Sequence, residues 1–262
     1  MKKKLLVGLA AAALAVIPAS AAFGDAHDTG QVVIVHGVPG FEADILVNGE
    51  TSDLTGLEFG DVAVVDLPAD SYDLGVAPAG STDAILAATA DVEAGVSYTV
   101  AAYLDTDGDP TLGLFVNEND VAGIQPFHLA NFVPVSIIAD GEIVEGFNSV
   151  ENGQTARIAI SGTVPGVGIG AADSNEPVIE LGDVEVPEDQ LLLVYAIGPD
   201  EGEELPSVEV QAIDVAEDHT PEEVPSGSAG LVSTGLPALV VALMLLGAVA
   251  MATPAIAARR RR

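Results

Sequence analysis

Residues 44–50 read Asp-Ile-Leu-Val-Asn-Gly-Glu, and residues 136–142 read Ser-Ile-Ile-Ala-Asp-Gly-Glu. Each stretch is a short apolar run that ends at a turn pair containing glycine. Runs of this kind, bounded by Gly, Asn, Asp or Pro, are typical of β-strands. Because the two stretches lie 92 residues apart, they indicate that one strand-rich unit is written twice.

Further pairs of segments keep an offset between 92 and 95 residues. They are His36–Pro39 with Asn131–Pro134, Gly60–Val65 with Gly153–Ile158, Asp91–Glu93 with Asp183–Glu185, and Tyr103 with Tyr195. The pattern predicts seven strands in the first copy, at residues 31–36, 43–47, 61–67, 71–77, 85–92, 97–104 and 112–117. In the second copy it predicts strands at residues 127–131, 135–139, 154–160, 167–171, 178–184, 191–197 and 208–213.

Seven short strands in roughly 90 residues is the number found in an immunoglobulin-like sandwich. The sequence therefore predicts an all-β protein with two tandem immunoglobulin-like β-sandwich domains, at residues 30–120 and 127–215, with the joint near Asp120–Pro126. Each half is expected to fold alone, because each has its own strands and an apolar core of ordinary domain size.

Several motifs of the first copy carry a family resemblance. They are Val-His-Gly-Val-Pro-Gly at residues 35–40, Asp-Ile-Leu-Val-Asn-Gly at 44–49, Phe-Gly-Asp at 59–61, Asp-Leu-Pro-Ala-Asp-Ser-Tyr at 66–72 and Glu-Ala-Gly-Val-Ser-Tyr-Thr-Val at 93–100. The chain resembles the bacterial domain-of-unknown-function family 4397 over His36–Phe115, and more weakly over Asn131–Val210. The resemblance implies exported β-sandwich domains, often in tandem, and supplies no catalytic residue.

The N-terminus has the features of a secretory signal peptide. Three lysines are followed by the apolar stretch Leu5–Ile17, then Pro18 and the small residues Ala19-Ser20-Ala21. This order matches the basic, apolar and cleavage regions of such peptides. Residues 1–21 are therefore expected to be a signal peptide, and the body of the protein to be exported.

The C-terminus predicts one transmembrane helix. Residues Leu236–Ala258 carry no charge and are followed by four arginines. That length can cross a bilayer, and flanking arginines stay on the cytoplasmic side, so the body faces outward. Residues 216–230, acidic and rich in Pro and Ser, are expected to form a stalk between the sandwiches and this anchor.

Leu231, Thr234 and Gly235 stand just before the apolar segment. This order resembles the sorting signal of cell-wall proteins, in which a sortase cuts between Thr and Gly, although Val232 replaces the usual Pro. Residues 231–262 are thus either a sorting signal or a plain membrane anchor with an arginine tail.

Charge and cysteine content exclude several classes of function. The chain has 40 Asp and Glu against 8 Lys and Arg, and Arg157 is the only base between the two termini. A surface of that sign repels phosphate backbones, so we expect no nucleic-acid partner. The absence of Cys excludes disulfides, thiolate nucleophiles and cysteine-ligated metals.

Three carboxylates at alternate positions, Asp105, Asp107 and Asp109, surround Gly108. Calcium loops have this spacing, but the acid expected at the twelfth position is replaced by Val116. A β-hairpin turn explains the same residues, because Asp-Gly is a preferred turn pair. The turn is the preferred interpretation, and weak calcium binding stays open as the alternative.

Histidine and tyrosine side chains allow two further hypotheses. His36 is interpreted as a polar residue that bonds to the following turn rather than as a base. Tyr72, Tyr98, Tyr103 and Tyr195 are interpreted as core or corner residues rather than as a sugar-stacking platform.

The predicted function is that of a non-catalytic cell-surface protein for binding, adhesion or envelope structure, with no catalytic residue and no cofactor other than possible Ca²⁺. The expected partners are the membrane, peptidoglycan through a sortase, and a surface glycan or protein. The alternatives are a secreted or surface hydrolase and a calcium-dependent carbohydrate-binding module.

Overall fold

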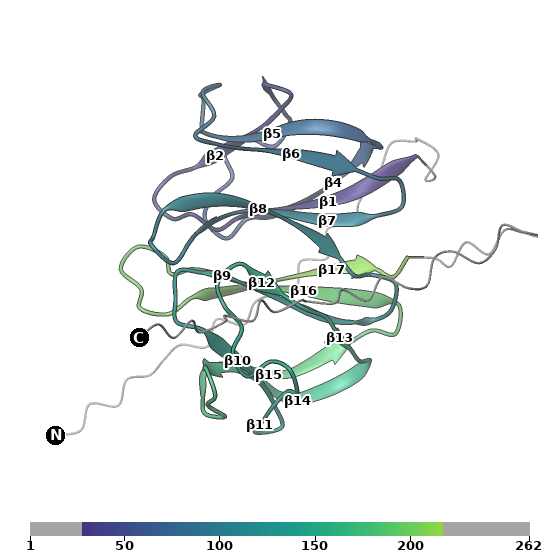
Figure 1. Cartoon of the computed structure of the whole chain (residues 1–262), viewed down its shortest axis with the longest axis vertical. Coiled ribbons are helices and arrows are strands. Elements are labelled where there is room, and N and C mark those ends of the chain that lie inside the picture. Colours follow the sequence, from purple (N-terminus) through teal and green to yellow (C-terminus); the bar gives the residue numbers. More distant parts are fainter. Residues whose placement is uncertain (1–27, 217–262) are drawn as a thin grey trace, which may run out of the picture. The chain divides into compact units, whose positions relative to one another are not determined.

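A computed structural model describes residues 28–216, and all its regular elements are β-strands, arranged in four sheets (Figure 1). The predicted signal peptide, the stalk beyond residue 216 and the C-terminal segment with Leu231, Thr234 and Gly235 lie outside these residues. The described residues include no helix with the length and hydrophobicity that crossing a membrane requires.

The first half consists of two four-stranded sheets. One has the order β4 (Val62–Pro68), β1 (Thr29–His36), β7 (Ser97–Leu104), β8 (Pro110–Asn117). The other has the order β3 (Glu50–Thr51), β2 (Ala43–Val47), β5 (Asp70–Pro78), β6 (Leu86–Val92). Between them lies an apolar core that includes Val32, Ile34, Ile45, Leu74 and Val100.

The second half repeats this arrangement strand for strand. One sheet has the order β12 (Gln154–Thr155), β9 (Gly123–Ala130), β16 (Gln190–Gly198), β17 (Ser207–Asp214), with β13 (Ile158–Ala159) also paired to β9. The other has the order β11 (Glu142–Ile143), β10 (Val135–Ala139), β14 (Gly162–Ala171), β15 (Pro177–Val186). β1 runs parallel to β7, and β9 runs parallel to β16. The two halves therefore share one strand order.

The predicted β-sandwich is confirmed, but the immunoglobulin-type strand order is wrong. That order places the first two strands in one sheet, whereas β1 and β2 lie in different sheets, and β1 is an interior strand between β4 and β7. The reason lies in the run Val32–Val35, which is buried on both faces. Val32 and Ile34 face the core of their own half, while Val33 and Val35 face the other half. A strand covered on both faces suits the interior of a sheet.

The second half begins before the predicted boundary at residue 127, because β9 starts at Gly123. Pro126 lies within this strand and pairs with Val194. On its other side β9 pairs with β12 through Phe127 and with β13 through Ile124. The break between β12 and β13 faces Pro126, which has no N–H to donate. The same break explains why the strand predicted at residues 154–160 is two short strands.

The connection between the halves is held by hydrogen bonds. The Arg157 Nη1 donates to the Glu118 carbonyl at 2.8 Å and pairs with Asp120, while Arg157 Nε lies 3.7 Å from the Glu118 carboxylate. Asn119 Nδ2 donates to the Asp214 carbonyl, and the Asn119 carbonyl accepts from the Ala216 amide. The only base of the body thus fastens the connecting segment to the second half.

Replacing Arg157 should loosen this connection. For Arg157→Ala we expect a loss of about 1 kcal/mol of unfolding free energy, because both carboxylates are largely exposed and such pairs contribute little, while the packed arginine stem is lost as well. Urea unfolding of the variant measures the change. Arg157→Lys is the matched control and should lose less, and an Arg157→Ala variant as stable as the parent would contradict this role.

Candidate functional site

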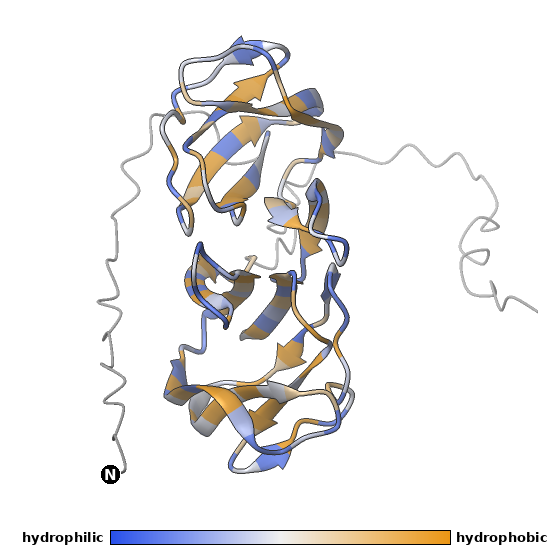
Figure 2. Ribbon diagram, turned by 90° about the vertical axis from the view of Figure 1, so that its left-hand side faces the viewer, coloured by the Kyte–Doolittle hydropathy of each residue, from blue (hydrophilic) through white to orange (hydrophobic). Residues whose placement is uncertain are grey.

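The two inner sheets, β4-β1-β7-β8 and β12-β9-β16-β17, pack face to face on an apolar cluster that we call the seam. In the ribbon coloured by hydropathy, hydrophobic residues recur along the strands of the sheets (Figure 2). The larger side chains of the seam come from the second half and are almost fully buried. The members of the seam are Val33, Val35, Ala101, Phe127, Leu129, Leu191, Leu193, Tyr195, Ile197 and Ile213. The seam is therefore packed as a hydrophobic core and not as a hydrated interface between two domains.

A buried polar chain crosses the seam at Tyr195. The Tyr195 hydroxyl lies 2.9 Å from Thr99 Oγ1, and Thr99 in turn donates to Asn117 Oδ1 at 2.8 Å. Because the single Thr99 proton is used there, Tyr195 is the donor to Thr99. Asn117 Nδ2 donates to Ser97 Oγ at 3.0 Å, and Ser97 donates to Gln31 Oε1 at 3.2 Å. Burial raises the pKa of Tyr195, so this donor stays protonated.

The two halves contact each other reciprocally. Two turns occupy equivalent places: Gly60 donates its amide to the His36 carbonyl, and Gly153 donates to the His128 carbonyl. Beside Gly60, Phe59 packs on Gly198, where an added Cβ would come within 2.7 Å of the ring. Beside Gly153, Asn152 Nδ2 donates to the Leu104 carbonyl at 3.0 Å.

Leu104 and Gly198 are the last residues of the equivalent strands β7 and β16. This register makes Tyr195 equivalent to Ala101, so the predicted pairing of Tyr103 with Tyr195 is wrong. Phe59 and Asn152 are likewise equivalent to each other. Phe59 of the first half contacts Gly198 of the second half, and its equivalent Asn152 contacts Leu104 of the first half, which is the equivalent of Gly198. This reciprocity is the pattern of a two-fold dimer interface.

His36 and His128 are the equivalent histidines of the two halves, and sequence reasoning missed this relation. His36 Nε2 bonds to the Phe41 carbonyl at 3.0 Å, and His128 Nε2 bonds to the Val133 carbonyl at 3.2 Å, each five residues further on. The alignment of His36 with Asn131 is therefore wrong, and the correct offset of 92 would have paired the two histidines. The interpretation of His36 as a residue that bonds to the following turn is confirmed.

Both imidazoles are almost completely buried, at 1% and 2% exposure. In each, Nδ1 is buried and has no hydrogen-bond partner in the described structure. Burial lowers the pKa of His36, against smaller raising effects of the Phe41 carbonyl and Asp61. Burial lowers the pKa of His128 in the same way, against the Val133 carbonyl and Glu151. Both rings are therefore neutral at pH 7 and donate through Nε2.

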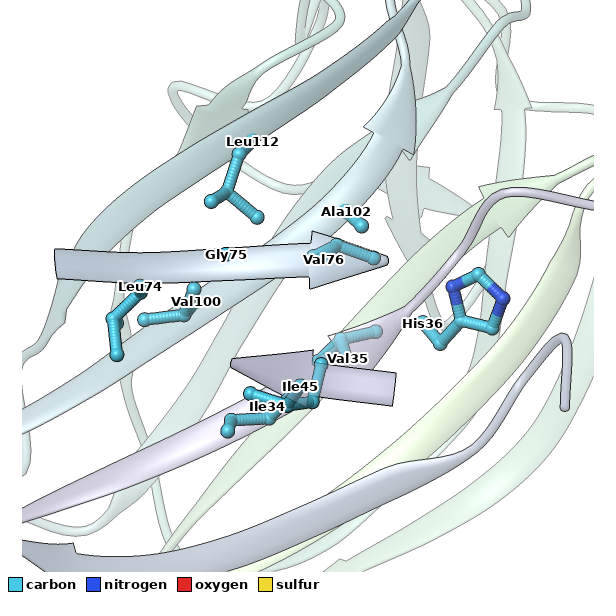
Figure 3. A pocket seen from close by; sticks show the side chains of 10 residues that line it. All are labelled: Ile34, Val35, His36, Ile45, Leu74, Gly75, Val76, Val100, Ala102 and Leu112. Carbon is cyan, nitrogen blue, oxygen red and sulfur yellow. The ribbon is translucent and has the colours of Figure 1, made fainter. Parts of the chain in front are cut away.

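His36 lies at one end of a small cavity in the first half (Figure 3). The other lining residues are apolar or glycine, and they include Ile34, Ile45, Leu74 and Val100. The cavity measures about 10 Å³, which admits at most a water molecule. It is a packing defect of the core and not a ligand pocket.

The predicted metal ligands form a turn. Asp105 Oδ1 accepts from the amides of Asp107 and Asp109, each at 2.9 Å, and the Asp105 carbonyl accepts from Gly108 at 3.1 Å. The Asp105 carboxylate is thus used to shape the hairpin between β7 and β8. Within residues 28–216 no group of three His, Asp or Glu side chains has an arrangement that suits a metal ion.

The four tyrosines occupy separate structural positions. Tyr195 lies in the seam, whereas Tyr98 belongs to the core of the first half and accepts from the Glu93 amide at 3.3 Å. Tyr72 donates to the Pro68 carbonyl at 2.9 Å, and Tyr103 packs at the border of the seam. Each hydroxyl or ring with a defined contact supports the fold, which favours the structural interpretation over a stacking platform.

A shallow open groove of about 580 Å³ borders the seam. Phe41, Phe59, Pro78 and Ala79 give it an apolar floor, and Glu42, Glu58 and Glu201 line it as well. Next to the lining residue Ala79, the amide of Gly80 donates to Oδ2 of the buried Asp44 at 2.7 Å, and Asp44 Oδ1 accepts from the Gly56 amide at 2.8 Å. The groove is far larger than the cavity beside His36 and is open to solvent.

Comparison with known proteins supports the family resemblance of the first half. Residues 30–137 match the model of a family described as a domain of unknown function, DUF4397. The match covers the first sandwich and extends through β9 into β10. The chain matches none of the curated protein sequences.

Proposed function

We propose that this protein is an exported, non-catalytic cell-surface protein whose two sandwiches act as one rigid binding or structural module, held at the envelope by its C-terminal segment. We also propose that the second half is a second copy of the family domain. The shared strand order of the halves supports that relation.

One observation carries the non-catalytic part of the proposal. The two histidines of the described residues, His36 and His128, and Tyr195 are of types that acid–base chemistry often uses, and all three are buried and bonded within the fold. They maintain the turns and the seam. The acidic groove and the acidic outer surface are then the parts left to meet a partner.

The location is tested on the whole protein in its own cells. We expect the mature N-terminus near residue 22 and the body accessible to added protease on intact cells. Mass spectrometry of wall-digested material decides the mode of attachment, since a C-terminus at Thr234 joined to peptidoglycan supports sorting. An intact Arg262 in the membrane fraction supports the plain anchor, and a body found only in the cytoplasm would overturn the proposal.

The non-catalytic assignment has its own test. The purified protein should not turn over ester, peptide or glycoside substrates. Turnover that a single substitution abolishes, in a variant that remains folded, would replace the binding module by the hydrolase.

The charge of the body predicts a strong dependence of stability on salt. All 40 acids lie between Asp25 and Glu223, with Arg157 as the one base among them, and folding brings these like charges together. Salt shortens their interaction range from about 30 Å at 0.01 M to about 3 Å at 1 M. The melting temperature should rise by about 2–4 °C for each kcal/mol of repulsion removed.

Thermal unfolding in NaCl and in CaCl₂ measures this effect. If screening alone is responsible, the effect should follow ionic strength, so millimolar CaCl₂ should raise the melting temperature far less than molar NaCl. A saturable calcium response that Asp107→Ala removes would instead show a site at the 105–109 turn, and an unchanged melting temperature in molar NaCl would contradict the prediction.

A further inference from the structure

Each half contains the same latch, which we define as a buried histidine and the turn bonded to its carbonyl. In the first half these are His36 and residues 58–61, with Gly60 donating to the His36 carbonyl at 2.8 Å. In the second half they are His128 and residues 151–154, with Gly153 donating to the His128 carbonyl at 2.7 Å. The turns are closed alike, because Glu58 donates its amide to Asp61 and Glu151 donates its amide to the Gln154 side chain.

Both latches end on the seam. The turn of the first latch presents Phe59 to Gly198 of the second half. The turn of the second latch presents Asn152, which donates to the Leu104 carbonyl of the first half and to the Ala130 carbonyl of its own half. Because each turn bonds to the main-chain carbonyl of its histidine, a shift of the main chain at His36 or His128 would displace a residue that contacts the other half.

Neither latch can accommodate a protonated ring in its present form. A charged imidazole has two N–H donors, and the buried Nδ1 of each histidine has no acceptor in the described structure. On one side, His36 pairs with Ala102 and His128 with Ala196, neither of which offers a side-chain acceptor. On the other side His128 pairs with Gln154, whose Oε1 already accepts from the Glu151 amide. A buried donor without a partner, on a charged ring, is strongly unfavourable unless the site opens to water.

Some carboxylates near the latches favour the protonated histidines, and one opposes opening of the seam. Asp61 lies near His36 and Glu151 near His128, and both favour the charged ring. Glu58 belongs to the first turn. Glu209 of β17 faces Gly60, and burial, together with Asp61, raises the pKa of Glu209. Protonation of Glu209 would relieve repulsion from Asp61 and so hold the seam closed, which opposes the effect of the histidines.

We propose that the seam is a pH-sensitive joint, in which proton uptake by His36 and His128 opens the two latches and loosens the contact between the sandwiches. The sign follows from burial. The folded protein disfavours the charged rings, so the unfolded or opened chain binds more protons as the pH falls below about 6.5. The stability that the latches supply is present above that pH and declines below it.

Amide hydrogen exchange of the full chain at pH 7.5 and pH 5.5, corrected for the intrinsic effect of pH on exchange, tests the proposal. Protection of the Gly60 and Gly153 amides and of β1, β9 and β16 should fall at least about tenfold at pH 5.5. Protection of the outer strands β5 and β14 should stay the same. Unchanged protection at the seam, or an equal fall in all four sheets, would overturn the proposal.

The matched variant is His36→Gln with His128→Gln, because glutamine can donate to the same carbonyls but does not titrate. We expect this double variant to lose the pH response of the seam, and a response equal to that of the parent protein would assign the effect to carboxylates. Glu209→Gln is the control and should keep the response; its loss there would also overturn the proposal.

A measurement on the unmodified protein keeps the test decisive if the double variant does not fold. NMR titration of the two imidazoles should show that both protonate over the pH range in which the seam amides lose protection. Protonation of the rings while the seam stays protected would contradict the joint.

Discussion

Residues 28–121, produced without the rest of the chain, are expected not to form a stable monomer. The isolated half would expose Val33, Val35 and Ala101, all buried in the intact seam. Such a contiguous apolar face drives association or collapse, and its burial contributes about 25 cal/mol per Å². The seam thus argues against the sequence-based expectation that each half folds alone.

Sedimentation and urea unfolding of three samples decide the matter: residues 28–121, residues 122–216 and their mixture. We expect each fragment to self-associate or to lack a cooperative transition, and an equimolar mixture to regain one. If both fragments unfold cooperatively as monomers, the halves are independent domains and the seam contributes little to the stability of either.

Substitution of Tyr195 should have the largest effect of any single change in the seam. Tyr195→Ala removes a fully buried ring that packs on Phe127 with centroids 4.8 Å apart, and it also removes the donor to Thr99. We expect a loss of about 3–5 kcal/mol, the range for large aromatic to alanine changes in cores. The midpoint of urea unfolding measures it.

Conservative variants separate the ring from the hydroxyl. Tyr195→Phe keeps the packing and should lose about 1–2 kcal/mol, because Thr99 loses a buried partner. Tyr72→Phe is the control, since the Tyr72 hydroxyl bonds to a carbonyl near the surface, and it should lose less. A Tyr195→Ala variant within about 1 kcal/mol of the parent protein would show that the seam tolerates a cavity there and is not packed as a core.

Local pattern was enough to predict most of the strands. The strands predicted at residues 43–47, 97–104 and 135–139 have these bounds in the structure, because each is an apolar run between turn residues. The topology was harder to infer. The continuous run Val32–Val35 indicates a strand buried on both faces, but the sequence does not say that its second cover is a sheet from the other half.

The latches show the same limit at the level of single residues. His36 could be singled out because it precedes a Gly-Val-Pro turn, whereas His128 lies inside a strand. Their equivalence follows from the register of β1 against β7 and of β9 against β16. The sequence alignment instead placed the equivalent of His36 at Asn131, three residues beyond His128. The cross-seam roles of Phe59 and Asn152 arise only from the contact between the halves.

The reciprocal seam also means that the five residues between β8 and β9, Glu118 to Ala122, act as a tether between two self-complementary partners. A short tether gives its ends an effective concentration in the millimolar range, so that association becomes an intramolecular event. A protease cut in this segment should therefore leave both pieces joined at high protein concentration and let them separate on dilution. The melting temperature of the nicked protein would then depend on concentration, as that of a dimer does.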